Sequence, residues 1–73
     1  MKINEAIRTL MKDLGVRQID MAVAIGKSKA TDIGARLSIK NLSFDKAKEM
    51  LDVLDYEIVI RPKSGDGEVI IID

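Results

Sequence analysis

The chain has 73 residues, no cysteine and no histidine, and its 12 basic side chains balance its 12 acidic ones. These counts fit one small domain, and they exclude a disulfide framework and the usual zinc ligands, so we expect no metal and no cofactor. No apolar run approaches the roughly 20 residues that cross a bilayer, and no signal-peptide pattern is present, so we expect a cytoplasmic protein without a membrane partner.

The first amphipathic segment predicts a helix over residues 4–14. Its apolar side chains recur at the spacing that places them on one helix face. They are Ile7, Leu10, Met11 and Leu14. Asn4 is expected to cap the start of this helix, and Gly15 is expected to adopt a left-handed conformation just after its end.

Two further helices are predicted on either side of Gly26, which is free to adopt positive φ in the turn between them. The first covers about residues 17–25, with its inward side chains at Met21, Ala22 and Ile25. The second follows Ser28 as its candidate N-cap, with inward side chains at Ala30, Ile33 and Leu37. Gly34 costs this helix roughly 1 kcal/mol relative to alanine, which indicates either a weak helix or the close approach of another group.

A fourth helix is predicted over about residues 43–54, after a loop at residues 38–42. Ser43 is the candidate N-cap, and Asp45 in the first turn suits the helix dipole. The expected inward side chains are Phe44, Ala47, Met50, Leu51 and Leu54.

The remaining residues predict a β-hairpin. Two β-branched runs, residues 56–60 and 69–72, are separated by Pro62 and a glycine-rich turn. We therefore expect a mostly α protein with a C-terminal β-hairpin, in which residues 1–55 form a four-helix domain and residues 56–73 form the two strands.

Charge is unevenly distributed along the chain although the total is zero. Residues 17–40 hold five basic side chains against two acidic ones, whereas residues 43–57 hold two against five. A basic middle segment of this kind provides a local positive charge, which a nucleic-acid-binding surface requires.

Residues 18–26 read Gln-Ile-Asp-Met-Ala-Val-Ala-Ile-Gly. This segment resembles the second helix and turn of lambda-repressor-like (Cro/XRE) helix-turn-helix domains. The resemblance continues through Arg36-Leu37-Ser38, Asn41 to Phe44 and Tyr56 to Pro62, so it covers nearly the whole chain. It implies a four-helix lambda-repressor-like domain followed by two strands, in a small DNA-binding transcriptional regulator of phage or mobile-element type. The regulator would be a repressor that binds a palindromic operator as a homodimer, with recognition helices about 34 Å apart.

The chain departs from the family pattern at three places. Arg17 stands at the N-cap of the second helix, where Ser or Thr is usual. Asp32 stands where the third helix usually has a buried aliphatic residue, and Ile33 follows it; a one-residue adjustment in the turn would restore the inward face and leaves the exact base-reading positions open. Gly34 and Ala35 replace longer polar residues.

The third helix is the expected recognition helix, which would enter the major groove of double-stranded DNA. The candidate base-reading residues are Ser28, Lys29, Thr31, Asp32, Ala35 and Arg36. The candidate phosphate contacts are Arg17, Gln18, Lys27, Lys40 and Asn41. The alternative is a merely solvated helix face in which Asp32 pairs with Arg36 four residues later.

The hairpin is the expected dimerisation element, because a lone hairpin is marginal in water and its second strand is apolar on both faces. Ile58, Ile60, Val69 and Ile71 are expected to share one face, and Val59, Ile70 and Ile72 the other. The full set of candidate dimer residues is Tyr56, Ile58, Val59, Ile60, Val69, Ile70, Ile71 and Ile72. The alternative is a hairpin folded entirely onto the helices of its own chain.

Two other classes of function remain for comparison. An enzyme is not expected, because His and Cys are absent and the Gly65-Asp66-Gly67 turn lacks the remainder of a phosphate-binding loop. A protein-interaction module on a helix-turn-helix scaffold is the alternative function: an antitoxin or a phage-encoded inhibitor that binds a toxin or another protein partner.

Overall fold

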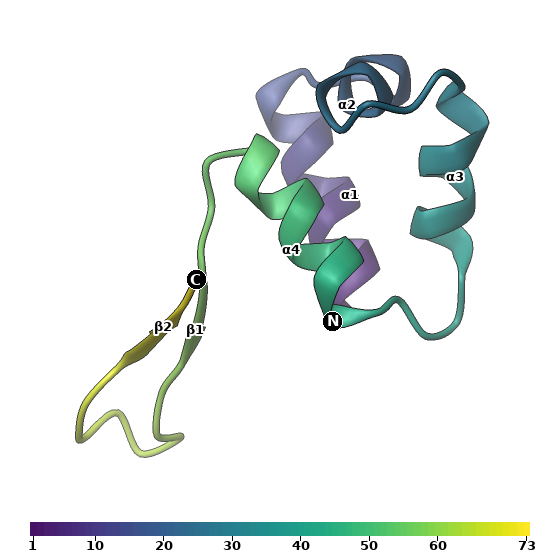
Figure 1. Cartoon of the computed structure of the whole chain (residues 1–73). Helices are drawn as coiled ribbons and strands as arrows, with labels where there is room; N and C mark the ends of the chain where they lie inside the picture. The colour runs from purple at the N-terminus through teal and green to yellow at the C-terminus, as the bar shows by residue number, and fades with distance from the viewer.

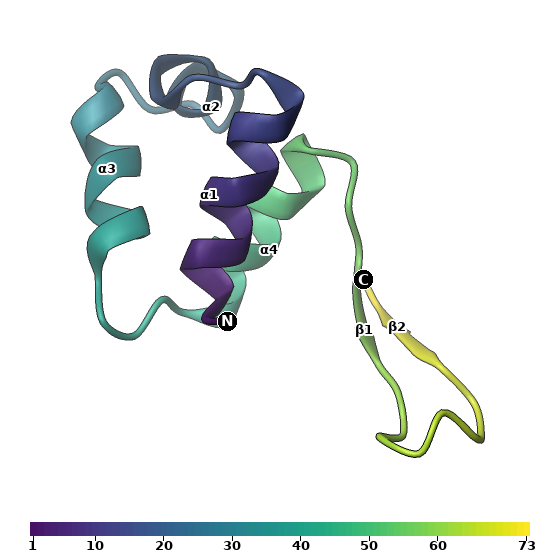
Figure 2. The ribbon, with the colours of Figure 1, turned by 180° about the vertical axis from the view of Figure 1, so that it is seen from behind.

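The structure, a computed structural model, describes all 73 residues as four helices followed by an antiparallel pair of short strands. The elements are α1 (Ile3–Leu14), α2 (Gln18–Ala24), α3 (Ala30–Ser38), α4 (Phe44–Val53), β1 (Ile58–Ile60) and β2 (Ile70–Ile72). The expected fold class, mostly α with a C-terminal β-hairpin, is confirmed. Helices α1 and α4 lie side by side, and α3 and the hairpin lie on opposite sides of them (Figures 1 and 2). None of the four helices has the length and hydropathy of a membrane-crossing segment.

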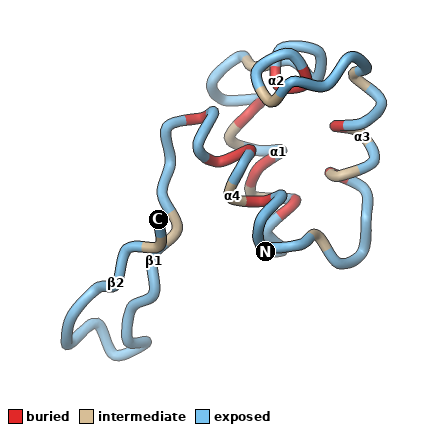
Figure 3. Tube along the Cα trace, in the orientation of Figure 1, coloured by how far each residue is buried: buried red, intermediate tan, exposed pale blue.

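The core is aliphatic and draws on all four helices. Each helix supplies one large, completely buried side chain: Ile7, Met21, Ile33 and Met50. Around them lie the other buried members of the cluster, which are Met11, Ala22, Leu37, Ala47, Leu51 and Leu54. Figure 3 shows these buried positions on all four helices, whereas the hairpin is almost entirely exposed. The helices therefore form one packed body that the strands do not complete.

Three residues expected in this core, Leu10, Ile25 and Ala30, are only partly buried, and two more are exposed. Leu14 and Phe44 each expose half of their surface. Leu14 is the last residue of α1, beside Gly15, which turns the chain away through the expected left-handed conformation at φ 70°. Phe44 is the first residue of α4, before the first inward position at Ala47. Both residues therefore stand at the end of a helix, beyond its buried positions.

The turn between α2 and α3 has the length that brings Ile33 inward. Gly26 has φ 79°, and the backbone N–H of Lys27 donates to the Ala22 carbonyl at 2.7 Å. Ile33 is completely buried and Asp32 is exposed, as the one-residue adjustment in the turn predicted. The N-cap of α3 lies one residue later than expected. Lys29, not Ser28, occupies this position, and its side chain makes no cap hydrogen bond. At α4 the Ser43 cap is confirmed by its hydroxyl, which accepts from the Lys46 N–H.

Asn4 has a different role from the expected cap. Lys2 is the N-cap residue of α1, and Asn4 lies buried inside the helix. The Asn4 amide Nδ2 donates to the carbonyls of Leu37 at 3.1 Å and Ile39 at 3.0 Å. Arg8 Nη2 also donates to the Leu37 carbonyl, at 3.2 Å. Because the last carbonyls of a helix have no partner within the helix, α1 satisfies the end of α3.

The hairpin pairs Ile58 with Ile72, Val59 with Ile71 and Ile60 with Ile70. Directly opposed residues of an antiparallel pair place their side chains on the same face. One face therefore carries Ile58, Ile60, Ile70 and Ile72, and the other carries Val59 and Ile71. The expectation that Ile71 shares a face with Ile58 and Ile60 is wrong by a one-residue shift of the second strand.

Neither face of the hairpin covers the helices. Ile58 is the strand residue that packs against the helical core. The rest of the hairpin extends away from α4 (Figure 1). The alternative of a hairpin folded entirely onto its own helices is therefore not the arrangement in the structure.

We predict that Asn4→Ala lowers the free energy of unfolding by about 1–3 kcal/mol, because it removes the side-chain donor of the Ile39 carbonyl and leaves the Leu37 carbonyl only the donor from Arg8. Urea denaturation followed by circular dichroism measures the change. Thr9→Ala is the matched control, since the Thr9 hydroxyl is exposed and donates only to the Glu5 carbonyl of its own helix. A loss for Asn4→Ala no larger than that for Thr9→Ala would contradict the role given to the Asn4 amide.

Candidate nucleic-acid interface

Helix α3 presents a largely polar face to solvent because its large apolar residues turn inward. Ile33 and Leu37 are buried against the other helices. Five of the six candidate base-reading residues are exposed on this helix or just before it, namely Ser28, Lys29, Thr31, Asp32 and Ala35. Apart from that of Lys29, their side chains are short, so the backbone of α3 can come close to another surface on this face.

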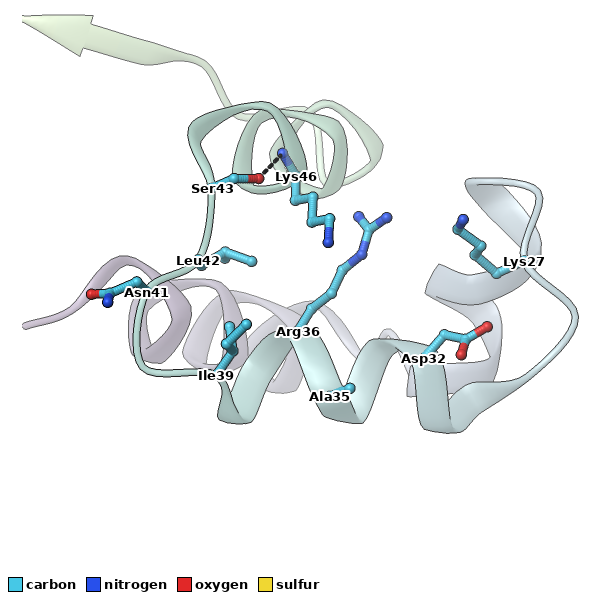
Figure 4. Close-up of a pocket in the computed structure, with 9 residues that line it drawn as sticks. All are labelled: Lys27, Asp32, Ala35, Arg36, Ile39, Asn41, Leu42, Ser43 and Lys46. Carbon is cyan, nitrogen blue, oxygen red and sulfur yellow. Dashed lines mark hydrogen bonds between the residues drawn. The ribbon is translucent and has the colours of Figure 1, made fainter.

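Arg36, the sixth candidate, does not point outward. Its side chain is only 11% exposed, and its Nη1 lies 2.7 Å from Glu49 Oε1 on α4. The alternative pairing of Asp32 with Arg36 is not formed either. The Arg36 side chain points from α3 toward α4 and crosses the space between the two helices (Figure 4). The expected outward position of Arg36 is therefore wrong.

A hollow of about 390 Å³ lies between α3 and the start of α4 (Figure 4). Its lining combines three cationic residues, one acidic residue and small polar or apolar ones: Lys27, Asp32, Ala35, Arg36, Ile39, Asn41, Leu42, Ser43 and Lys46. Lys46 and Ser43 were not among the expected site residues, because they belong to a segment whose overall charge is acidic. The signal for them is the N-cap at Ser43, which fixes where α4 begins and so where Lys46 projects.

Gln18 explains the glycine inside α3. A Cβ built at Gly34 would lie 3.2 Å from Gln18 Oε1, a tighter contact than most Cβ atoms make. Of the two expectations for Gly34, the close approach of another group is therefore the one found in the structure, and that group is the end of an exposed side chain. Gln18 is the first residue of α2. Its amide consequently lies against the middle of α3, at the junction of the two helices.

Arg17 and Asp20 begin α2 in place of the usual Ser or Thr cap. Asp20 Oδ2 accepts from the backbone N–H of Arg17 at 3.0 Å and from its Nε at 2.9 Å, and Oδ1 accepts from Nη2 at 2.9 Å. The hydrogen bonds from the Arg17 side chain, and then the one from its backbone, hold the pKa of the Asp20 carboxyl below its ordinary value, and the pKa of Arg17 is raised correspondingly. Arg17 therefore contacts a phosphate only if it gives up an exposed pair, which costs little in water.

The remaining phosphate candidates flank both ends of α3. Lys27 lies in the turn before the helix, and Lys40 and Asn41 lie in the loop after it; all three are exposed. The ion pairs of the structure are Arg17–Asp20, Arg36–Glu49 and Lys48–Asp52. Lys27, Lys29 and Lys40 are thus cations without an acidic partner. Unpaired cations at both ends of an exposed helix provide the charge that binding to a polyanion requires.

We predict that Gly34→Ala raises the free energy of unfolding by up to about 1 kcal/mol, because alanine is the better helix former and the exposed amide of Gln18 can shift by the few tenths of an ångström needed. Chemical denaturation measures the free energy of unfolding of four chains: the unmodified chain, Gly34→Ala, Gln18→Ala and the double variant. The gain should be larger in the Gln18→Ala background, where no contact opposes the new methyl group. An equal or smaller gain there would show that Gln18 does not limit the space at Gly34.

Comparison with protein-family models, with curated proteins and with solved structures finds no match to this chain.

Proposed function

We propose that this protein is a sequence-specific DNA-binding transcriptional regulator, a repressor of the lambda-repressor-like helix-turn-helix type that acts in the cytoplasm as a homodimer on a palindromic operator. The observation that carries the proposal is the exposed polar face of α3, bounded at both ends by the unpaired cations Lys27, Lys29 and Lys40. The sequence resemblance to helix-turn-helix domains supports the same conclusion.

In this proposal α3 reads bases from the major groove, which is wide enough to admit an α-helix. Thr31 and Ala35 lie one turn apart on the exposed face and offer methyl groups that can contact thymine. Lys29 can donate to guanine, and Asp32 can accept from the amino group of cytosine. Arg36 has a supporting role instead, because its ion pair with Glu49 connects α3 to α4.

The phosphate contacts come from the residues around α3. Lys27, Lys40 and Asn41 flank the helix, and Gln18 lies against its middle. Contacts of this kind position a protein on DNA without reading its sequence. A net charge of zero is compatible with them, since the basic residues gather near α3 and the acidic ones near α4.

The test of the proposal is binding of the full chain to mixed-sequence DNA at several salt concentrations, followed by selection of preferred sites from a random DNA pool. Counterion release makes the affinity for DNA fall steeply as salt rises. A steep fall and an enriched palindrome support the proposal. The absence of binding at low salt would contradict it and favour the alternative function.

We predict that Lys40→Gln weakens binding to operator and to unrelated DNA by the same factor, and lowers the slope of log affinity against log salt by about one, because one phosphate contact is lost. Titrations by fluorescence anisotropy measure both quantities. Lys63→Gln in the connection between β1 and β2 is the matched control, since it removes the same charge from the hairpin, which lies on the opposite side of the α1–α4 pair from α3. A loss confined to the operator would instead assign Lys40 to base reading.

A protein-interaction module is the second candidate, and the exposed hairpin favours it. Val59, Ile60 and Ile70 have no covering layer within the chain. An antitoxin or a phage-encoded inhibitor could cover such a surface with a toxin or another protein partner. The salt titration separates the two candidates, because a helix-turn-helix scaffold without a DNA function has no steep dependence on salt.

We predict that the full chain sediments as a homodimer, with twice the 8.1 kDa mass of one chain. The physical reason is that burying each exposed aliphatic side chain of the hairpin contributes about 1.5–3 kcal/mol, which matters in a domain with little stability to spare. Analytical ultracentrifugation at micromolar concentration makes the measurement. A single species with the mass of one chain would contradict the dimer.

A further inference from the structure

We propose that the hollow between α3 and the start of α4 binds a small phosphate monoester, a molecule with a phosphoryl group and a short apolar body, and that this ligand competes with DNA. The ligand site rests on the residues of the hollow alone, whereas the competition rests on the function proposed above. Three features of the hollow carry the proposal: a guanidinium with unused donors, a second cation that faces the same space, and an apolar wall.

Arg36 brings to the hollow a guanidinium with too few partners. Its side chain is only 11% exposed, yet its one hydrogen bond is that from Nη1 to Glu49 Oε1. A guanidinium has five N–H donors, so Nε and Nη2 have no acceptor in the protein. No buried side-chain nitrogen of the chain lacks a partner, so these two atoms are not enclosed by protein, and the hollow that Arg36 lines is the space open to them. An anion in the hollow can therefore accept hydrogen bonds that Glu49 leaves unused.

Lys46 adds a second positive charge to the same space. It lines the hollow together with Arg36, and its ammonium has no acidic partner. Figure 4 shows both side chains pointing into the space between α3 and α4. The start of α4 at Ser43 adds the positive end of the helix dipole on this side. Glu49 offsets only one of the two charges, so an anion between Arg36 and Lys46 removes a repulsion that the protein leaves in place.

The arrangement of the charges favours a phosphoryl group over a carboxylate. A phosphate monoester carries three strong acceptor oxygens and a charge of about −1.5 to −2 at neutral pH. It can accept from the Arg36 fork and from Lys46 at the same time, whereas a carboxylate has only two oxygens. Asp32, the one carboxylate in the lining, lies with Lys27 toward the α2–α3 turn, away from Lys46 and Ser43 (Figure 4).

The rest of the lining limits the size and the chemistry of the ligand. Ile39 and Leu42 give the hollow an apolar wall in the loop after α3, and Ile39 exposes 47% of its surface. The volume of about 390 Å³ is near the lower end of the range for small-molecule sites, about 300–1,000 Å³. A ligand with a short apolar body covers this wall, which inorganic phosphate leaves in contact with water.

A ligand in the hollow covers part of the surface proposed to contact DNA. Lys27, Asp32, Ala35 and Asn41 line the hollow and are also candidates for DNA contacts. A bound phosphate monoester also cancels local positive charge, on which binding to the DNA backbone depends. Each ligand therefore weakens the binding of the other, and this coupling is reciprocal. The monoester acts as an inducer, which releases the proposed repressor from its operator.

Nuclear magnetic resonance titrations of the ¹⁵N-labelled full chain test the site without DNA. The probe is phenyl phosphate, and the comparison probes are inorganic phosphate and dimethyl phosphate, all at constant ionic strength. We expect saturable shifts of the backbone amide signals around the hollow with phenyl phosphate and weaker binding of the other two. Inorganic phosphate lacks the apolar body, and dimethyl phosphate has the single charge of a DNA backbone phosphate.

Two variants change the affinity for phenyl phosphate in opposite directions. We expect Lys46→Gln to weaken binding by about three- to tenfold, because one charge-assisted hydrogen bond is lost. We expect Glu49→Gln to strengthen it by about two- to fivefold, because the exposed carboxylate that competes for Arg36 is removed. A gain in affinity cannot come from a chain that fails to fold. Lys63→Gln and Glu68→Gln are the matched controls, since they make the same changes of charge in the connection between β1 and β2.

Four results would overturn the site. Shifts that spread over the exposed lysines without saturating would show that no site exists. Equal losses for Lys46→Gln and Lys63→Gln would reduce the effect to the overall charge, and weaker binding by Glu49→Gln would contradict the role given to Arg36. Binding of dimethyl phosphate as tight as that of phenyl phosphate would assign the hollow to the DNA backbone instead.

Fluorescence anisotropy with labelled DNA then tests the competition. We expect saturating phenyl phosphate to lower the affinity of the chain for DNA at constant ionic strength, and to lower it less in Lys46→Gln. An unchanged affinity for DNA would overturn the competition. Saturable binding of phenyl phosphate by a chain that does not bind DNA would sustain the ligand site and contradict only the proposed DNA function.

Discussion

The hydrogen bonds from the Asn4 amide fix the end of α3 on α1, beside the core packing of Ile33 and Leu37, and the candidate interface depends on where α3 is held. α3 packs against α2 and α1 rather than broadly against α4, with which it shares the Arg36–Glu49 ion pair and the hollow beside it. Its end is held by the two hydrogen bonds from Asn4 to the Leu37 and Ile39 carbonyls. Its middle lies against Gln18. A helix fixed at these two points presents its exposed face in one orientation, which is what a recognition surface requires.

The parts of the fold that could be predicted from the sequence are those that local chemistry decides. Positive φ at Gly15 and Gly26, the cap at Ser43 and the burial of Ile33 each follow from a residue and its near neighbours. The predicted cap at Asn4 is wrong for the same reason, because an asparagine at the start of a helix is a good local cap, whereas the partners of the Asn4 amide lie 33 and 35 residues away. Arg36 likewise pairs with a residue 13 positions later, which no helical periodicity reveals.

In the hairpin and the candidate site, too, local sequence predicts some features, whereas others depend on residues far apart in the chain. Two β-branched runs predict two strands, but the connection between Ile60 and Ile70 is too long for a two-residue turn to set the register. A slip of one residue moves every side chain of a strand to the other face. For this reason Ile71 shares a face with Val59 and not, as expected, with Ile58 and Ile60. At the site, exposure of Thr31 and Ala35 follows from the buried stripe of α3. Lys46 could not be found this way, because its place in the hollow depends on how α4 packs beside α3.

The position of the hairpin bears on how a dimer would meet DNA. α3 and the hairpin lie on opposite sides of the α1–α4 pair, so two chains joined through their hairpins carry their α3 helices on the outside. Both α1–α4 pairs and both hairpins then lie between the two α3 helices. One turn of DNA covers only about 34 Å, and half-sites occur at multiples of that distance. The half-site spacing of an operator therefore tests whether the hairpins join the two copies, because recognition helices on the outside of such a dimer are held apart by both α1–α4 pairs.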